Sequence, residues 1–142
     1  MDEQNGSEVE DLFGMWNAAL ESGSAGAVVS LYADDAVLIP TTTQQIRVGR
    51  TRIQEYFADF LPRYRPRAWI TQENPRHLQS IRWNSGLYSF EFRAGPGSPR
   101  TVEARFTFVY QLFGNRWLIT QHHSSVIPAA FKKDAILEEM EF

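Results

Sequence analysis

The segment Arg100–Phe113 constrains the fold more than any other part of the sequence, because its side chains alternate in character. The side chains at the even-numbered positions are apolar: Val102, Ala104, Phe106, Phe108, Tyr110 and Leu112. The side chains at the odd-numbered positions are largely polar and include Thr101, Glu103, Arg105, Thr107 and Gln111. Successive side chains of a strand point to opposite faces, so this pattern predicts a long strand with one face in the core.

The rest of the second half of the chain also has the composition of strands. We expect them at Ala68–Glu73, Pro75–Trp83, Leu87–Arg93 and Arg116–Val126. Turn residues separate them at Asn84–Gly86, Ala94–Pro99 and Gly114–Asn115. In the first half, a short strand is predicted at Ala36–Ile39, entered through a turn at Asp34–Asp35 and ended by Pro40.

Helical periodicity is confined to the first half of the chain. Ser7 is suited to an N-cap, and the helix after it carries Val9, Leu12, Phe13, Trp16 and Leu20. Ser24 can cap a short second helix with Val28, Leu31 and Tyr32 on one side. A third helix opens at Gly49–Thr51, presents Ile53, Tyr56, Phe57, Phe60 and Leu61, and is closed by Pro62 and Pro66.

Helices that are segregated from an antiparallel meander indicate an α+β domain. We expect one strongly curved antiparallel sheet that wraps around the N-terminal helices and forms a cone. A chain of 142 residues is the size of a single domain, residues 1–142. Within it, residues 1–6 are expected to be disordered and residues 129–142 to form a tail with helical potential.

Composition excludes several classes of function. The chain has no cysteine, which rules out disulfides, thiolate metal sites and thiol nucleophiles. Its net charge of −3 gives no basic field for nucleic acid. No apolar run is long enough to span a membrane, and the acidic N-terminus is unlike a targeting peptide, so we expect a soluble cytoplasmic protein with no membrane or nucleic-acid partner.

Two segments and one proline in the C-terminal third carry a family resemblance: Ala104–Tyr110, Arg116–Ser125 and Pro128. They resemble the nuclear transport factor 2-like superfamily, and within it the SgcJ/EcaC-type bacterial family and the association (hub) domain of calcium/calmodulin-dependent protein kinase II. Upstream segments fall in the matching order, at Trp16–Leu20, Leu31–Leu38, Gly49–Ile53 and Asn74–Pro75. The resemblance covers about residues 7–130.

The resemblance implies a cone with a pocket at its wide end. The superfamily contains isomerases, dehydratases, small-molecule binders and assembly domains, so the fold alone settles little about function. The kinase hub assembles into rings of stacked dimers. An oxidoreductase label is frequent in the SgcJ/EcaC-type family, but this chain has no dinucleotide-binding, flavin or haem motif, and we expect no cofactor.

The predicted pocket is aromatic and is formed by Trp16, Tyr32, Tyr56, Phe106, Phe108, His122 and Ser124. It either holds a small organic ligand or is a filled core, and the sequence leaves both open. The resemblance implies arginines in the kinase hub's pocket. Phe108 and Ser124 stand at two of those positions and Glu91 at a third, which puts an anionic ligand in doubt.

The pair His122–His123 is the clearest candidate for chemistry. Neighbours on a strand face opposite ways, so they cannot bind one metal ion together, and no metal site is expected. His122 is a candidate ligand contact or general base, although a hydrogen-bonded structural role is commoner. Glu91 is a candidate acid if it points inward among Tyr88, Phe90 and Phe92. No residue beyond these two is a catalytic candidate.

Arg63, Arg65 and Arg67 form a basic cluster after the third helix. Together with neighbouring aromatics they could stack on nucleic acid. A solvated connector, or an interface with ion pairs to the acidic tail residues Glu138, Glu139 and Glu141, is the favoured explanation.

The outer face of the long strands carries apolar side chains that a monomer would expose, which usually marks a subunit contact. The predicted interface consists of Val109, Phe113, Trp117, Ile119, Gln121 and His123. The expected partner is therefore a second copy of the chain, in a dimer or a larger ring of dimers. The predicted function is a self-assembling hub-like domain. The alternative is a small-molecule binder or a cofactor-independent acid–base enzyme, of isomerase or dehydratase type, that uses the cone.

Overall fold

The computed structural model describes residues 2–128, with side chains from Leu12 onward. Its helices are α1 (Asp2–Ser22), α2 (Ala25–Val29) and α3 (Arg50–Tyr64). Its strands are β1 (Tyr32–Ile39), β2 (Arg47–Val48), β3 (Pro66–Glu73), β4 (Arg76–Leu78), β5 (Ile81–Phe92), β6 (Arg100–Phe113) and β7 (Arg116–Val126). The α+β class is confirmed. The tail at residues 129–142 lies outside the described residues.

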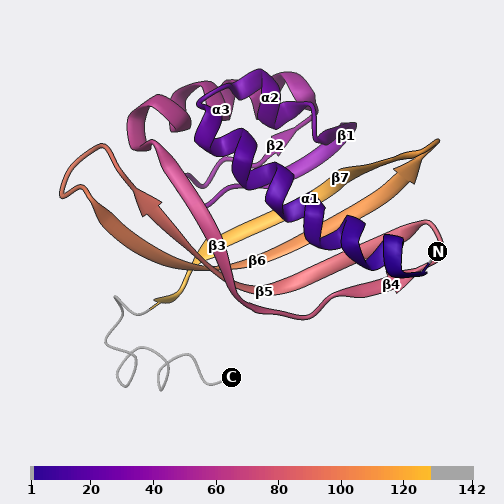
Figure 1. Ribbon diagram of the computed structural model, residues 1–142. Helices are drawn as coiled ribbons and strands as arrows, with labels where there is room; N and C mark the ends of the chain where they lie inside the picture. The colour runs from indigo at the N-terminus through magenta and orange to yellow at the C-terminus, as the bar shows by residue number, and fades with distance from the viewer. Residues whose placement is uncertain (1, 129–142) are drawn as a thin grey trace, which may run out of the picture.

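The strands form one strongly curved sheet in the order β2-β1-β7-β6-β5-β3, with β4 paired to β5. Neighbouring strands are antiparallel except β1 and β7, which run parallel. All three helices lie on the concave side of this sheet (Figure 1). The predicted cone is therefore confirmed, and no helix of the described residues covers the convex, outer face.

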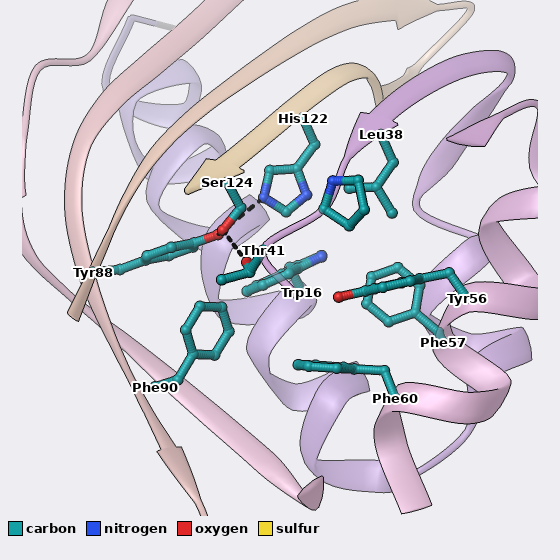
Figure 2. A pocket seen from close by; sticks show the side chains of 11 residues that line it. Trp16, Leu38, Thr41, Tyr56, Phe57, Phe60, Tyr88, Phe90, His122 and Ser124 are labelled. Atoms are coloured by element: carbon teal, nitrogen blue, oxygen red, sulfur yellow. Dashed lines mark hydrogen bonds between the residues drawn. The ribbon is translucent and has the colours of Figure 1, made fainter. Parts of the chain in front are cut away.

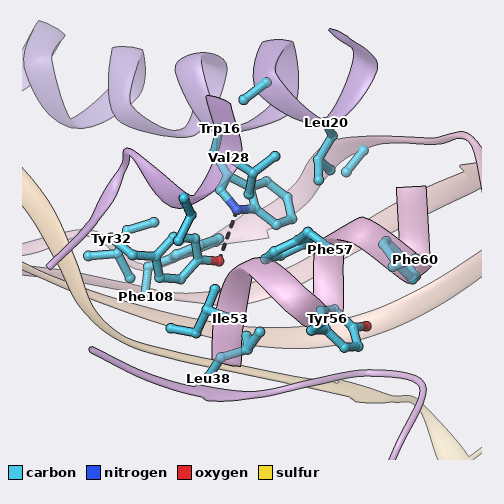
Figure 3. Packing of buried hydrophobic residues seen from close by; sticks show 14 of the residues in the cluster. Trp16, Leu20, Val28, Tyr32, Leu38, Ile53, Tyr56, Phe57, Phe60 and Phe108 are labelled. Atoms are coloured by element: carbon cyan, nitrogen blue, oxygen red, sulfur yellow. Dashed lines mark hydrogen bonds between the residues drawn. The ribbon is translucent and has the colours of Figure 1, made fainter. Parts of the chain in front are cut away.

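Aromatic rings fill the space between the helices and the sheet (Figure 3). Trp16 of α1 is 1% exposed and stacks near-parallel to Tyr88 of β5, with ring centroids 6.1 Å apart. Phe57 of α3 packs against Tyr32 of β1, and Val28 of α2 is fully buried beside them. Burying large apolar surface in this way is the main stabilising contribution to a fold of this size.

The boundaries of the elements differ from the predicted ones in the first half of the chain. Helix α1 begins at Asp2, so residues 2–6, expected to be disordered, are helical and Ser7 is not its N-cap. Strand β1 begins at Tyr32, and the predicted turn at Asp34–Asp35 lies inside it, where the pairing with β7 shifts register. Pro62 lies within α3; the helix ends instead at Tyr64, and its C-cap Arg65 adopts a left-handed conformation with φ of 46°.

The predicted turn at Asn84–Gly86 is wrong, because β5 runs straight through it. Gly86 pairs with Phe106 of β6, and the chain turns earlier, at Gln79–Ser80. The glycine is needed because β3 approaches closely at this point. A Cβ on Gly86 would lie only 2.0 Å from the backbone oxygen of Gln72.

A bulge in β7 changes which side chains face outward. Gln121 pairs with Val109 and Ile119 pairs with Tyr110, so Thr120 is the extra residue on β7. On the N-terminal side of Thr120, the odd-numbered side chains of β7 therefore face the core and the even-numbered ones face outward. Ile119, predicted to lie at an outer interface, is 2% exposed in the core instead.

Candidate functional site

His122 of β7 lies at the centre of the cone interior and is 2% exposed. The ring of Phe108, on β6, stacks on it with centroids 4.0 Å apart and an interplanar angle of 17°. Trp16 of α1 meets the same ring edge-on, at 5.3 Å and 90°. The imidazole is thus held in one orientation by aromatic contacts, as the parity of β6 and β7 predicts.

A chain of hydrogen bonds passes through His122. The Trp16 indole N–H donates to the Tyr32 hydroxyl at 3.1 Å, and that hydroxyl lies 2.9 Å from Nδ1 of His122. On the other side, Nε2 of His122 lies 3.2 Å from the Tyr88 hydroxyl. The Tyr88 hydroxyl donates to Oγ of Ser124 at 2.5 Å (Figure 2).

These contacts fix the tautomer of His122. Because the Tyr88 hydroxyl gives its proton to Ser124, it accepts from His122, and the ring proton therefore sits on Nε2. Nδ1 is left as an acceptor for the Tyr32 hydroxyl proton, while the Tyr32 oxygen accepts from Trp16. Every side-chain polar atom of this buried chain is satisfied with His122 neutral.

The electrostatics of the interior favour uncharged groups. Burial lowers the pKa of His122 to about 3, and the neighbouring His123 contributes in the same direction. Burial also raises the pKa of Tyr56 to about 12 and raises that of Tyr32 and Tyr88 above the usual range. At neutral pH the imidazole and the three phenols all lack charge, because a charged form would lose its hydration without gaining a counter-ion.

The chain of hydrogen bonds ends at a small cavity at the mouth of the cone. Its volume of about 10 Å³ is room for a single water. The lining residues are Trp16, Leu38, Pro40, Thr41, Tyr56, Phe57, Phe60, Tyr88, Phe90, His122 and Ser124 (Figure 2). Thr41 closes the chain, since its Oγ1 is hydrogen-bonded to Oγ of Ser124.

Four of the predicted pocket residues, Trp16, Tyr56, His122 and Ser124, line this cavity. The other three do not: Tyr32, Phe106 and Phe108 are buried in the core around it. Seven lining residues were missed, and two of them, Tyr88 and Thr41, belong to the chain of hydrogen bonds. Tyr88 lay on a strand whose inward parity the sequence left undecided, and Thr41 lies on a loop, where no periodicity indicates direction.

Glu91 does not join His122. It faces outward on β5, where its carboxylate accepts a hydrogen bond from Arg67 Nε at 2.7 Å. Tyr88, Phe90 and Phe92 take the inward positions because apolar rings gain more from burial than a carboxylate does. The candidate pair of His122 and Glu91 is therefore wrong, and no group of three His, Asp or Glu side chains in the described part of the chain could hold a metal ion.

The outer face of the sheet carries a row of paired side chains that crosses five strands. It runs through Val48 (β2), Val37 (β1), Gln121 (β7), Val109 (β6) and Trp83 (β5). Four of the five are apolar, and Val48 is 61% exposed. We call these five residues the outer row. Trp83 and Val37 were not predicted because the outward face of their strands was not assigned, and Val48 was not predicted because no strand was expected at β2.

The other predicted interface residues are divided between the two faces. Phe113 is 42% exposed at the end of β6, and His123 is exposed next to the outer row. Trp117 pairs with Leu112 on the inward parity and is half-buried beneath the Arg82 guanidinium, 4.7 Å from the ring centroid. Trp117 and Ile119 therefore do not belong to the outer face, because the bulge at Thr120 turns them inward.

A depression of about 180 Å³ borders the outer row. It is lined by Arg105, Phe106, Thr107, His123 and Ser125. Its two basic side chains, Arg105 and His123, have no ion-pair partner among the side chains that the structure describes, from Leu12 to Pro128.

The basic cluster after α3 is tied to the chain's own acids. Arg63 pairs with Asp59 at 2.9 Å and Arg67 pairs with Glu91. Arg65 ends α3. The acidic residues of the tail lie outside the described residues.

Among the helices described, no segment is long and apolar enough to cross a membrane.

Comparison with known proteins places this geometry in a family. Residues 5–128 match the family model of the calcium/calmodulin dependent protein kinase II association domain. A solved structure of a candidate association domain of this kind, from Xanthomonas campestris, is 40% identical, with a TM-score of 0.82 over 86% of this chain and 87% of that one. A comparison with curated proteins gives no match.

More distant structures share the fold. A candidate dehydratase of the NTF2-like family from Streptomyces avermitilis has a TM-score of 0.75 at 14% identity, covering 89% of this chain and 99% of that one. A protein with a cystatin-like fold from Caulobacter vibrioides has a TM-score of 0.73 at 12% identity, covering 95% and 99%. The expected nuclear transport factor 2-like fold is confirmed, and the chain belongs to the calcium/calmodulin dependent protein kinase II association domain family.

Proposed function

We propose that this chain is a self-associating domain whose subunits pack together through the outer face of the sheet. The observation that carries this proposal is the outer row. It places Val37, Val109 and Trp83 in one line on a sheet face that no described helix covers. An apolar patch on an uncovered face is typical of a subunit contact.

Membership of an association-domain family supports the same proposal. A two-fold dimer places the same surface on both sides of its interface. The outer row suits this, because a line of apolar side chains can face its own copy, with Arg105 and His123 at the polar margin. A larger ring of dimers would need a second contact surface. The resemblance to the kinase hub is what supports such a ring.

The proposal is tested by placing a charge in the outer row. Val109→Glu buries a carboxylate in the proposed interface and should abolish association, because the charge would be desolvated without a partner. Thr101→Glu is the matched control: it adds the same charge to the exposed outer face of β6, eight residues from Val109. Sedimentation velocity should show a monomer for the first variant and the wild-type mass for the second. Equal masses for both would refute the proposed interface.

A second candidate function is the binding of a small molecule at the mouth of the cone. The observation in its favour is the continuous chain of polar contacts from Trp16 to Thr41, which a purely structural core would not need. Catalysis by general acid–base transfer is less well supported. His122, with its pKa of about 3, is a poor base at neutral pH, and Glu91 lies on the opposite face.

A further inference from the structure

The segment between β1 and β2, residues 40–46, closes the cavity at the mouth of the cone. Pro40 and Thr41 line the cavity, and Thr41 Oγ1 is hydrogen-bonded to Ser124 on β7. The next residue reaches the opposite wall: Thr42 Oγ1 lies 3.0 Å from the Tyr56 hydroxyl on α3. Residues 42–46 are otherwise exposed. Two threonine hydroxyls thus hold an exposed segment across the opening.

The cavity has room for one water, and Thr41 is the one lining residue that is not fully buried, so we expect a larger ligand to enter by displacing this segment. Displacing it would remove Pro40 and Thr41 from the lining. It would expose Ser124 and Tyr56, each of which would lose a hydrogen-bond partner. A ligand hydroxyl or carbonyl oxygen could then take the place of the threonine hydroxyls, against walls of Trp16, Phe60 and Phe90.

The lining also limits the charge of the ligand. Among the described residues that line the cavity, none carries a formal charge at neutral pH. Arg47 lies over the Tyr56 ring, with its guanidinium carbon 5.6 Å from the ring centroid, but it does not line the cavity. An anion inside would lose its hydration and gain no counter-ion, which is costly.

We propose that the cavity takes the uncharged, hydroxyl- or carbonyl-bearing part of a small aromatic compound, admitted when residues 40–46 swing away from Ser124 and Tyr56. This inference rests on the second proposed function, binding in the cone, and is independent of self-association.

The test compares two probes of similar shape, benzyl alcohol and benzoate, on the full chain. Binding is measured by titration calorimetry and by the shift of the His122 NMR signals. We expect saturable binding of benzyl alcohol and at least tenfold weaker binding of benzoate. Ser124→Ala should weaken the binding of benzyl alcohol, because Ser124 would contact the ligand.

Thr42→Val tests the closing segment. Thr42 does not line the cavity, so the substitution changes the cost of opening and leaves the ligand contacts intact. Removing one hydrogen bond should tighten benzyl alcohol binding roughly three- to tenfold. Thr43→Val is the matched control. It lies on the same exposed segment, its hydroxyl bonds only to the nearby backbone N–H of Gln45 among the described residues, and it should leave the affinity unchanged.

The outcomes distinguish a failure of the uncharged-ligand inference from a failure of ligand binding in the cone. If benzoate shifts the His122 signals at equal or lower concentration than benzyl alcohol, the uncharged-ligand inference is overturned while binding in the cone stands. If neither probe shifts those signals, even in Thr42→Val, the cavity is a closed core and both fail. Equal affinities for Thr42→Val and wild type would overturn the role of the closing segment.

Discussion

The Tyr32 hydroxyl lies 2.9 Å from Nδ1 of His122, and it also accepts the indole N–H of Trp16. One side chain on β1 thereby satisfies a donor on α1 and an acceptor on β7, and all three residues are at most 2% exposed. The contact joins the first helix to the last strand through the core, and it makes the neutral form of His122 part of the folded state.

Removing this hydroxyl should destabilise the protein. Tyr32→Phe leaves the Trp16 N–H and Nδ1 of His122 buried without partners, and we expect a loss of about 1–3 kcal/mol in the free energy of unfolding. Urea denaturation followed by circular dichroism measures it. Tyr64→Phe, at a half-buried tyrosine whose hydroxyl makes no hydrogen bond within the described residues, should cost much less. Comparable losses in the two variants would contradict the role assigned to Tyr32.

Stability should also depend on pH through His122. Its pKa in the folded protein is about 3, below the ordinary value of 6.5, so between these values the unfolded chain takes up a proton that the folded chain does not. The His122 contribution is therefore fully present above about pH 6.5 and is lost progressively as the pH falls toward 3. In NMR titrations the Nε2–H tautomer of His122 should persist at pH 5. A His122 midpoint near 6.5 would refute this.

Two glycines should respond oppositely to the same substitution. Gly86→Ala places a methyl group 2.0 Å from the Gln72 backbone oxygen, so β3 and β5 must separate, and we expect a loss of more than about 2 kcal/mol. Gly14→Ala lies in α1 with nothing within 4 Å of the added carbon, and it should stabilise the helix by about 0.5–1 kcal/mol. Thermal denaturation of both variants tests the close approach of the strands. If Gly86→Ala unfolds at the wild-type temperature, that approach is wrong.

The bulge at Thr120 gives a third pair of variants. Ile119→Ala should destabilise the fold by about 2–5 kcal/mol, because Ile119 is buried in the core. Leu118→Ala should destabilise the fold less, because Leu118 pairs with Gln111 at a position that faces outward. Urea denaturation at a protein concentration where the chain is monomeric separates the two effects. If Leu118→Ala were the more destabilising of the two, the bulge would be wrong and β7 would be a regular strand with Leu118 inward, as expected from the sequence.

The alternation of Arg100–Phe113 was enough to predict which face of β6 is buried. The inward position of His122 and Ser124 was predicted from the even positions of the last strand, with Leu118 taken as inward; His122 and Ser124 are buried, but Leu118 pairs with Gln111 on the outward side. The bulge at Thr120 could not be predicted, because Trp117–Gln121 contains no glycine or proline to indicate it. Gly86 was interpreted as part of a turn, since the sequence does not distinguish a glycine that reverses the chain from one that admits a neighbouring strand. Thr41 was missed because its direction depends on a loop conformation set by contacts with β7 and α3.

Sedimentation of the full chain at micromolar concentration tests the proposed self-association most directly. We predict a dimer or a larger even-numbered assembly in both low and high salt, because apolar burial across the outer row depends little on ionic strength. A single species at the monomer mass of 16.3 kDa in both conditions would contradict the account and leave small-molecule binding in the cone as the proposed function that still stands.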